Sequence, residues 1–171
     1  MTGSGSRERG IVASKKYQLI QIGIAVMDVF KPETFTSDIG YDQWNSQPQA
    51  MMVNKFTPER IKAGPKPSAV DMEATAWLDA HIGPGGHDLH AVGWNVGAFD
   101  MPFVREYLPG VADRFSYRSV DLNSIIFSMA DTDNEYRKLK SKAKTGAEAV
   151  LRQAGIAPEW HNAGYDAAAA L

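Results

Sequence analysis

Residues 88–100 read Asp88-Leu89-His90-Ala91-Val92-Gly93-Trp94-Asn95-Val96-Gly97-Ala98-Phe99-Asp100 and join a strand-like half to a helix-like half. The half that ends at Gly93 has the apolar character of a β-strand, whereas the pattern after Asn95 is typical of a helix with Phe99, Phe103 and Tyr107 on one side. Gly97 lies in the turn between the two halves. A strand that runs directly into a helix indicates an α/β domain.

The segment before this stretch predicts a pair of strands. Residues 17–30 carry apolar side chains with a period of two, and both faces are mostly apolar, which is typical of a strand covered on both sides. Residues 28–46 are polar and rich in turn formers, and residues 49–53 resume a short strand-like run. We therefore expect 17–30 and 49–53 to pair in antiparallel orientation.

The rest of the chain predicts further helices and one more strand. Residues 68–82 form an amphipathic pattern with a possible capping pair at Ser68 and Asp71, and residues 115–122 read as a strand. A helix at 123–129 is expected to turn Ile125, Ile126 and Met129 inward, and a capping pair at Thr145 and Glu148 predicts a helix through Val150 and Leu151 that stops at Gly155. This alternation predicts a three-layer α/β domain, with a mixed sheet flanked by helices.

Composition restricts the function. The chain has 171 residues with a formal net charge of -2 and no cysteine, so disulfides, thiolate catalysis and cysteine-ligated zinc are excluded. No apolar run approaches the roughly 18 residues of a membrane span, and the first residues lack the apolar core of a signal peptide. The sequence favours a single cytoplasmic domain over 17–171 with no membrane partner, preceded by a flexible leader over 1–16.

The net charge also argues against tight non-specific binding of duplex nucleic acid, which needs clustered cations. Cations concentrate only at residues 137–144, where Arg137, Lys138, Lys140, Lys142 and Lys144 follow a group of acidic residues. Such a run is more often a solvated loop or helix face than a binding patch. If the chain has a nucleic-acid site, this run is the first candidate for contact with the backbone.

Three side chains suggest phosphodiester chemistry. Asp100 follows a strand, and the tail segment His161-Asn162-Ala163-Gly164-Tyr165-Asp166-Ala167 supplies an imidazole and a second carboxylate five positions apart. Carboxylate oxygens suit Mg²⁺ and Mn²⁺, and two such ions can stabilise the attacking and leaving oxygens of phosphodiester hydrolysis. An imidazole can take a proton near neutral pH. Either segment alone would be a weak signal, because a capping acid or a hydrogen-bonded histidine explains each.

Together, the two segments resemble the second and third motifs of the DEDDh 3′–5′ exonucleases, a family that includes RNase T-like enzymes and has an RNase H-like fold. The resemblance covers residues 17–171. It implies that Asp100 and Asp166 are metal ligands in a two-metal Mg²⁺ or Mn²⁺ site and that His161 is the general base. It further implies that Asn95 and Phe99 bind the 3′-terminal nucleotide, that Tyr165 packs beneath the site, and that Asp121 is at most a supporting carboxylate.

The first motif of that family departs from its pattern here. The family has an aspartate and a glutamate two positions apart at the end of a central strand, whereas this chain has Ser6 and Glu8. Glu8 is the candidate third metal ligand, and a serine hydroxyl is a poorer Mg²⁺ ligand than a carboxylate. Three interpretations remain: a chain truncated at both ends, which we favour, a degenerate relative that binds without cutting, or a weakened site completed by Glu8.

The expected function is therefore release of nucleoside monophosphates from the 3′ end of single-stranded DNA or RNA, in DNA repair or RNA processing. The alternative is an inactive exonuclease-like domain that binds nucleic acid or protein, and a homodimer or a larger replication or repair assembly would fit either. His81, His87 and His90 could suggest zinc by spacing, but no convergent fourth ligand accompanies them, so we expect surface histidines.

Overall fold

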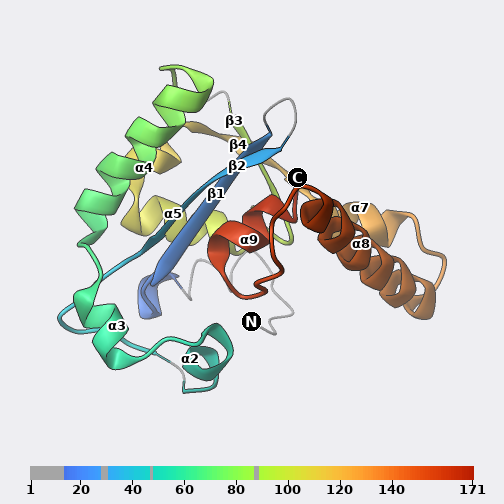
Figure 1. Ribbon diagram of the computed structural model, residues 1–171, viewed down its shortest axis with the longest axis horizontal. Helices are drawn as coiled ribbons and strands as arrows, with labels where there is room; N and C mark the ends of the chain where they lie inside the picture. Colours follow the sequence, from blue (N-terminus) through green and yellow to red (C-terminus); the bar gives the residue numbers. More distant parts are fainter. Residues whose placement is uncertain (1–13, 28–30, 47, 87–88) are drawn as a thin grey trace.

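The structure is a computed structural model that describes residues 14–27, 31–46, 48–86 and 89–171 (Figure 1). It is a mixed α/β fold, in agreement with the predicted class. The elements follow in the order β1 (Gln21–Met27), β2 (Pro32–Asp38), α2 (Pro48–Asn54), α3 (Pro58–Ala63), α4 (Pro67–Ile82), β3 (Leu89–Gly93), α5 (Asp100–Tyr107), α6 (Pro109–Ala112), β4 (Phe115–Asp121), α7 (Leu122–Ser128), α8 (Asp133–Gln153) and α9 (Ala163–Ala168).

The strands form two separate sheets within the described residues, and not the single mixed sheet that the sequence predicts. β1 pairs with β2 in antiparallel orientation, from Gln21 opposite Asp38 to Met27 opposite Pro32. β3 pairs with β4 in parallel orientation, and the register shifts between Leu89 and Ala91. Parallel strands need a crossover connection, which α5 and α6 provide here.

The predicted partner of β1 was wrong. Residues 49–53 belong to helix α2, and the strand that pairs with β1 is β2, which lies in the stretch predicted to be a polar loop. The physical reason lies in the local residues: Pro48 at the first position of α2 fixes a helical φ, while Thr34, Phe35 and Thr36 favour an extended backbone. Phe35 is the buried member of β2, which explains the weak apolar signal of this strand.

The main core lies between the antiparallel sheet and α4. Ile22, Ile24 and Phe35 from the strands join the cluster that contains the fully buried α4 side chains Val70, Ala74 and Leu78. The predicted helix at 68–82 is confirmed, with Pro67 as its first residue, but the predicted capping pair is not formed. The Asp71 carboxylate instead accepts hydrogen bonds from the amides of Gly110 (2.9 Å) and Val111 (2.9 Å), and so ties α4 to α6.

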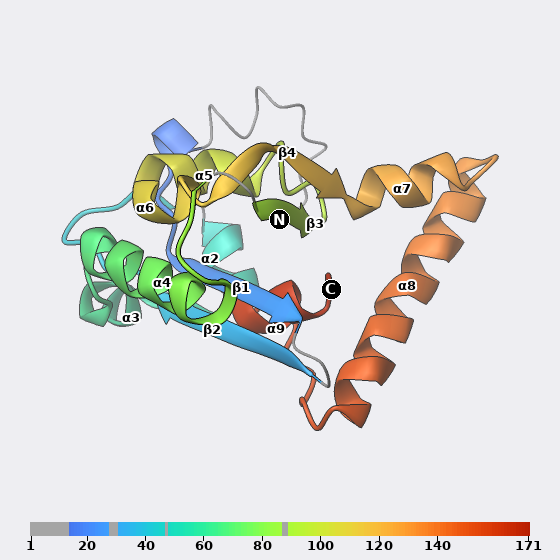
Figure 2. The same ribbon diagram turned by 90° about the horizontal axis from the view of Figure 1, so that it is seen from above.

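α7 and α8 form an arm (residues 122–153) that projects from the rest of the fold (Figure 2). α8 begins twelve residues before the predicted Thr145 cap: the Thr132 hydroxyl accepts from the Glu135 amide (3.2 Å), and Thr145 lies inside the helix. The inward orientation predicted for α7 is wrong, because Ile125 is 45% exposed and Met129 66%. None of the helices in the described ranges is both long and apolar enough to cross a membrane.

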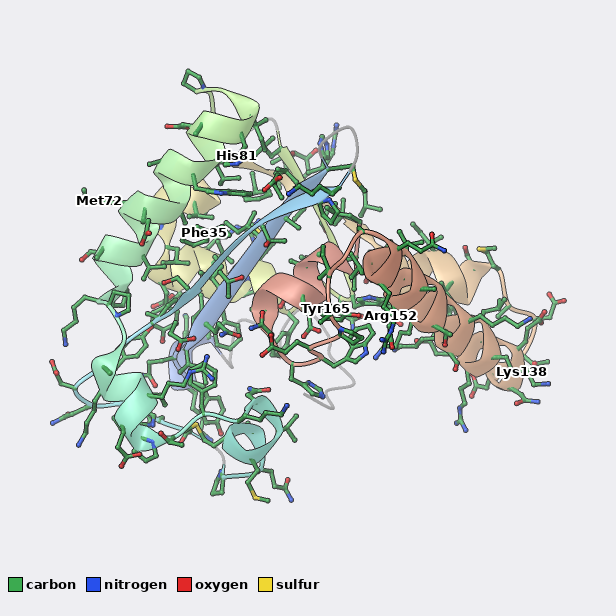
Figure 3. All side chains as sticks on the ribbon, in the orientation of Figure 1. Phe35, Met72, His81, Lys138, Arg152 and Tyr165 are labelled. Carbon is green, nitrogen blue, oxygen red and sulfur yellow. The ribbon has the colours of Figure 1, made fainter. Side chains whose placement is uncertain are left out.

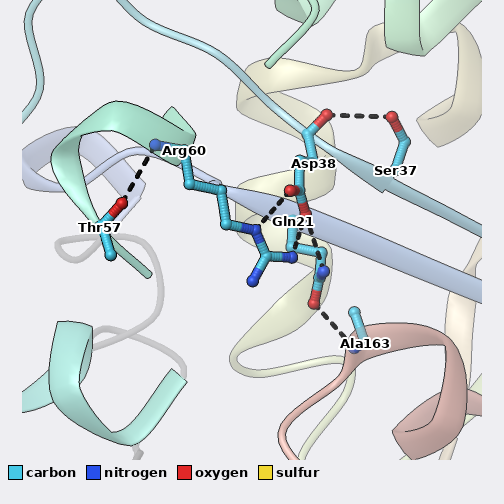
Figure 4. A network of polar contacts seen from close by, with 6 residues as sticks. All are labelled: Gln21, Ser37, Asp38, Thr57, Arg60 and Ala163. Carbon is cyan, nitrogen blue, oxygen red and sulfur yellow. Dashed lines mark hydrogen bonds and ion pairs between the residues drawn. The ribbon is translucent and has the colours of Figure 1, made fainter. Parts of the chain in front are cut away.

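α9 packs directly against the backbone of the antiparallel sheet. A Cβ atom on Gly23 of β1 would overlap the carbonyl group of Ala163, and one on Gly164 would overlap the Thr36 hydroxyl of β2. Gln21 adds a polar anchor, because its Oε1 accepts from the Ala163 amide (2.9 Å) while its Nε2 donates to Asp38 (2.8 Å) (Figure 4). The tail segment with Asp166 is thereby fixed to the start of β1.

Candidate active site

The turn after β3 places Asp100 at the first position of α5. Asn95 adopts a left-handed backbone (φ 58°), and its carbonyl accepts hydrogen bonds from the amides of Ala98 (3.1 Å) and Phe99 (2.9 Å). Gly97 faces β4 so closely that a Cβ atom there would overlap the hydroxyl of Ser119. Left-handed backbone at a non-glycine residue costs free energy and persists only where the surroundings stabilise it.

Asp121 at the end of β4 stabilises this turn. Its Oδ1 accepts from the amides of Asn95 (3.0 Å) and Asn123 (2.9 Å), and its Oδ2 accepts from the Ser124 hydroxyl (3.2 Å). The Asn123 side chain in turn donates to Oδ1 of Asn95 (3.2 Å). These bonds join the end of β4 to the Asn95 turn, and they engage the Asn95 side chain with α7.

The second carboxylate is oriented by the loop that enters α9. Asn162 caps this helix, with its Oδ1 accepting from the amides of Gly164 (3.0 Å) and Tyr165 (3.3 Å). His161 has a left-handed backbone (φ 70°), and its amide donates to Oδ1 of Asp166 (3.4 Å). The histidine and the aspartate of the tail motif are thus adjacent, with the imidazole at the surface.

Asp100 and Asp166 come together from α5 and α9. The Asp100 side chain keeps solvent-accessible surface, yet protein surrounds its carboxylate closely enough that desolvation raises its pKa to about 7, and the charge of Asp166 adds to this effect. Desolvation also raises the pKa of Asp166, while the charges of His161 and Lys144 act in the opposite direction. Two carboxylates that repel each other in one place are a feature of functional sites more often than of packing alone.

The pair suits a hard divalent cation. Carboxylate oxygens are the ligands that Mg²⁺ and Mn²⁺ prefer, and a cation between them would relieve both their desolvation and their mutual repulsion. No group of three or more His, Cys, Asp or Glu side chains in metal-binding geometry occurs among the residues the structure describes. Glu8, the predicted third ligand, and Ser6 lie outside the described residues. Among the described residues, Asp100 and Asp166 are therefore the two candidate ligands, and no third acidic or histidine side chain joins them.

The remaining predicted side chains border this pair. Tyr165 is 5% exposed and packs edge-on against Trp160, at 5.0 Å between ring centroids. Phe99 pairs with Phe103 at 5.4 Å and keeps part of its surface accessible. His161 lines a small cleft of about 40 Å³, whose wall also includes Gln21, Arg60 and Trp160.

Sequence reasoning missed the groups that fix the tail segment. Asn162 carries a recognisable signal, because asparagine before a short run of helix formers is a favoured cap. No such signal marks Gln21, or the ion pair of Arg60 with Asp38 at 2.6 Å between Nε and Oδ2, because their partners are far away in sequence (Figure 4). Comparison with models of known protein families finds no match to this chain, and comparison with curated proteins finds none either.

Proposed function

We propose that the protein is a metal-dependent 3′–5′ exonuclease with an RNase H-like fold, related to the DEDDh enzymes, that releases nucleoside monophosphates from single-stranded DNA or RNA. The observation that carries the proposal is the convergence of Asp100 and Asp166 beside the His161 loop, with the pKa of each carboxyl group raised. Two neighbouring carboxyl groups with raised pKa values are typical of functional sites, and such a pair can hold a catalytic cation.

Each residue has a role in this proposal. Asp100 and Asp166 would hold Mg²⁺ or Mn²⁺, with Glu8 as the proposed third ligand; the bound metal would make a water molecule more acidic and neutralise charge on the phosphate. His161 takes the proton from the attacking water. Asn95 and Phe99 contact the 3′-terminal nucleotide, and Asp121 keeps the Asn95 turn in place through the hydrogen bonds described above.

The test is release of mononucleotides from a 3′-labelled single strand in Mn²⁺. We expect the purified chain to release labelled mononucleotide and Asp166→Asn to reduce the rate by at least about a hundredfold, because the variant removes one charge from the cation site. Asp113→Asn is the matched control. Asp113 is exposed at the end of α6, so this substitution removes the same charge at a position away from the candidate site. Equal rates for the wild type and Asp166→Asn would reject the proposal.

A second candidate is a domain that binds nucleic acid or a protein partner without cleaving. It is favoured by one observation, namely that the described residues bring together two carboxylates and not three. It predicts binding of a labelled oligonucleotide with no product in Mn²⁺. Where the wild type releases no product, Ser6→Asp separates a weakened exonuclease site, in which the added acidic group should create cleavage, from a domain that only binds, in which it should not.

A further inference from the structure

One face of α8 is directed at the candidate site. Tyr136, Lys140 and Lys144 are spaced four residues apart, so they form a ridge along one side of the helix with about 6 Å between successive positions. We call these three residues the α8 ridge. Figure 3 shows that α8 lies next to α9, where Arg152 and Tyr165 are close to each other. The ridge continues from this junction toward the outer part of the arm.

Lys140 connects the ridge to the turn that carries Asp100. Its ammonium group donates to Oδ1 of Asn123 (3.1 Å), the side chain that also holds Asn95, and lies 5.5 Å from the centroid of the Trp94 ring. The Tyr136 hydroxyl donates to the same Asn123 oxygen. The positive charge is therefore held in a defined place at the entrance to the strand-to-helix turn.

Lys144 has the corresponding position at the tail segment. Its ammonium group lies 5.3 Å from the centroid of the Trp160 ring, and that ring packs edge-on against Tyr165, the neighbour of Asp166 in α9. Glu148, one turn further on, is already engaged by Arg152 (2.9 Å) and by the Trp160 indole (3.2 Å). Neither Lys140 nor Lys144 forms an ion pair with any carboxylate in the described part of the chain.

From this arrangement we infer that the α8 ridge is the surface along which the phosphodiester backbone of a single-stranded nucleic acid approaches Asp100 and Asp166. The inference rests on the proposed function and adds where the substrate lies. A phosphate chain that approaches two carboxylates is repelled by their negative charge. Ammonium groups that form no ion pair and lie beside these carboxylates reduce this repulsion. A single strand fits better than a duplex, because aromatic rings accompany both lysines and the net charge of the chain is -2.

The same helix provides its own control. Lys138 and Lys142 are two residues away from ridge positions, which is about 200° around the helix, and both are exposed. Figure 3 shows Lys138 projecting from the outer part of the arm. Substitution of these two lysines changes the net charge by the same amount on the opposite face.

The experiment measures binding without cleavage, by fluorescence anisotropy of a fluorescein-labelled oligothymidylate in EDTA. We expect the double variant Lys140→Gln with Lys144→Gln to raise Kd on the order of tenfold at low salt and to lower the salt slope by roughly 1.4, since each single-strand phosphate contact contributes roughly 0.7. Lys138→Gln with Lys142→Gln should change Kd less than about twofold. Lys144→Gln alone, which breaks no hydrogen bond, should show about half of the effect on the slope.

Equal weakening by the two double variants, or unchanged binding by the ridge variant, would overturn the inference. Displacement of the oligonucleotide by poly-L-glutamate at equal charge concentration would also overturn it, in favour of an acidic protein partner. The failure of the proposed function looks different: ridge-dependent binding would persist in EDTA, but the wild type would release no mononucleotide in Mn²⁺. Conversely, cleavage that is independent of the ridge would refute the inference alone.

Discussion

The carboxylates of Asp100 and Asp166 give the molecule a local instability when no cation is bound. Desolvation and, to a smaller extent, the charge of Asp166 raise the Asp100 pKa to about 7 although the side chain is exposed, so ionisation above this pH opposes folding by an amount that solvent reduces. Natural chains retain such costs mainly where function requires them. At the scale of single residues, two features therefore mark the candidate site: the side chains it contains and the free energy needed to ionise its carboxylates in the folded state.

This cost has a measurable pH dependence in metal-free buffer. The folded-state pKa of Asp100 lies above the unfolded value of about 3.8, so its contribution to stability is present below about pH 4 and is lost as pH rises toward 7. Asp100→Asn removes the ionisation. At about pH 8 we expect the free energy of unfolding of this variant to exceed that of the wild type by on the order of 1 kcal/mol. This value is discounted because solvent reaches the side chain. At about pH 4 the gain should be smaller or absent.

Urea denaturation in EDTA at these two pH values checks the prediction. Asp113→Asn serves as the control for loss of an exposed charge. A gain for Asp100→Asn that is the same at both pH values would contradict the assigned pKa shift.

At the scale of elements, the position of α9 depends on two glycines. Because a Cβ atom on Gly23 would overlap the backbone of Ala163, Gly23→Ala must displace α9 from β1. We expect a loss of about 1–3 kcal/mol of stability, the range for overpacked sites, together with loss of the proposed exonuclease activity. Gly146→Ala is the matched control: its Cβ would meet open space on α8, so the variant should gain about 0.5–1 kcal/mol through helix propensity. Thermal unfolding of both variants tests this, and equal effects would contradict the packing described here.

Sequence patterns predicted those elements whose signals are local. The run into β3, the buried stripe of Val70, Ala74 and Leu78 on α4 and the turn at Gly97 all follow from periodicity and turn residues. β2 was missed because it buries one large side chain, Phe35, and reads as polar. The start of α8 was placed too late because Thr145 and Glu148 resemble a cap, while the functioning cap is Thr132 with Glu135, whose carboxylate accepts from the Asp131 amide (3.0 Å).

At the scale of the whole molecule, the candidate site depends on contacts between segments that are distant in sequence. The sequence predicted Asp100, Asp166 and His161 as site residues, but not the hydrogen bond from the Ala163 amide to Gln21 that fixes the tail segment to β1, nor the α8 ridge. Such contacts leave no periodic pattern, because each partner alone is an ordinary polar residue. The arm formed by α7 and α8 was likewise not predicted as an arm, since the first of its helices was expected to turn Ile125, Ile126 and Met129 inward (Figure 2).

The central claim is that Asp100 and Asp166 hold a common divalent cation. Isothermal titration of Mn²⁺ into the metal-free protein tests it most directly, in the wild type, Asp100→Asn, Asp166→Asn and the Asp113→Asn control. We predict saturable binding in the wild type and the control, and its loss in both site variants, because each removes a charged ligand from the same ion. Identical isotherms for all four proteins would contradict the claim.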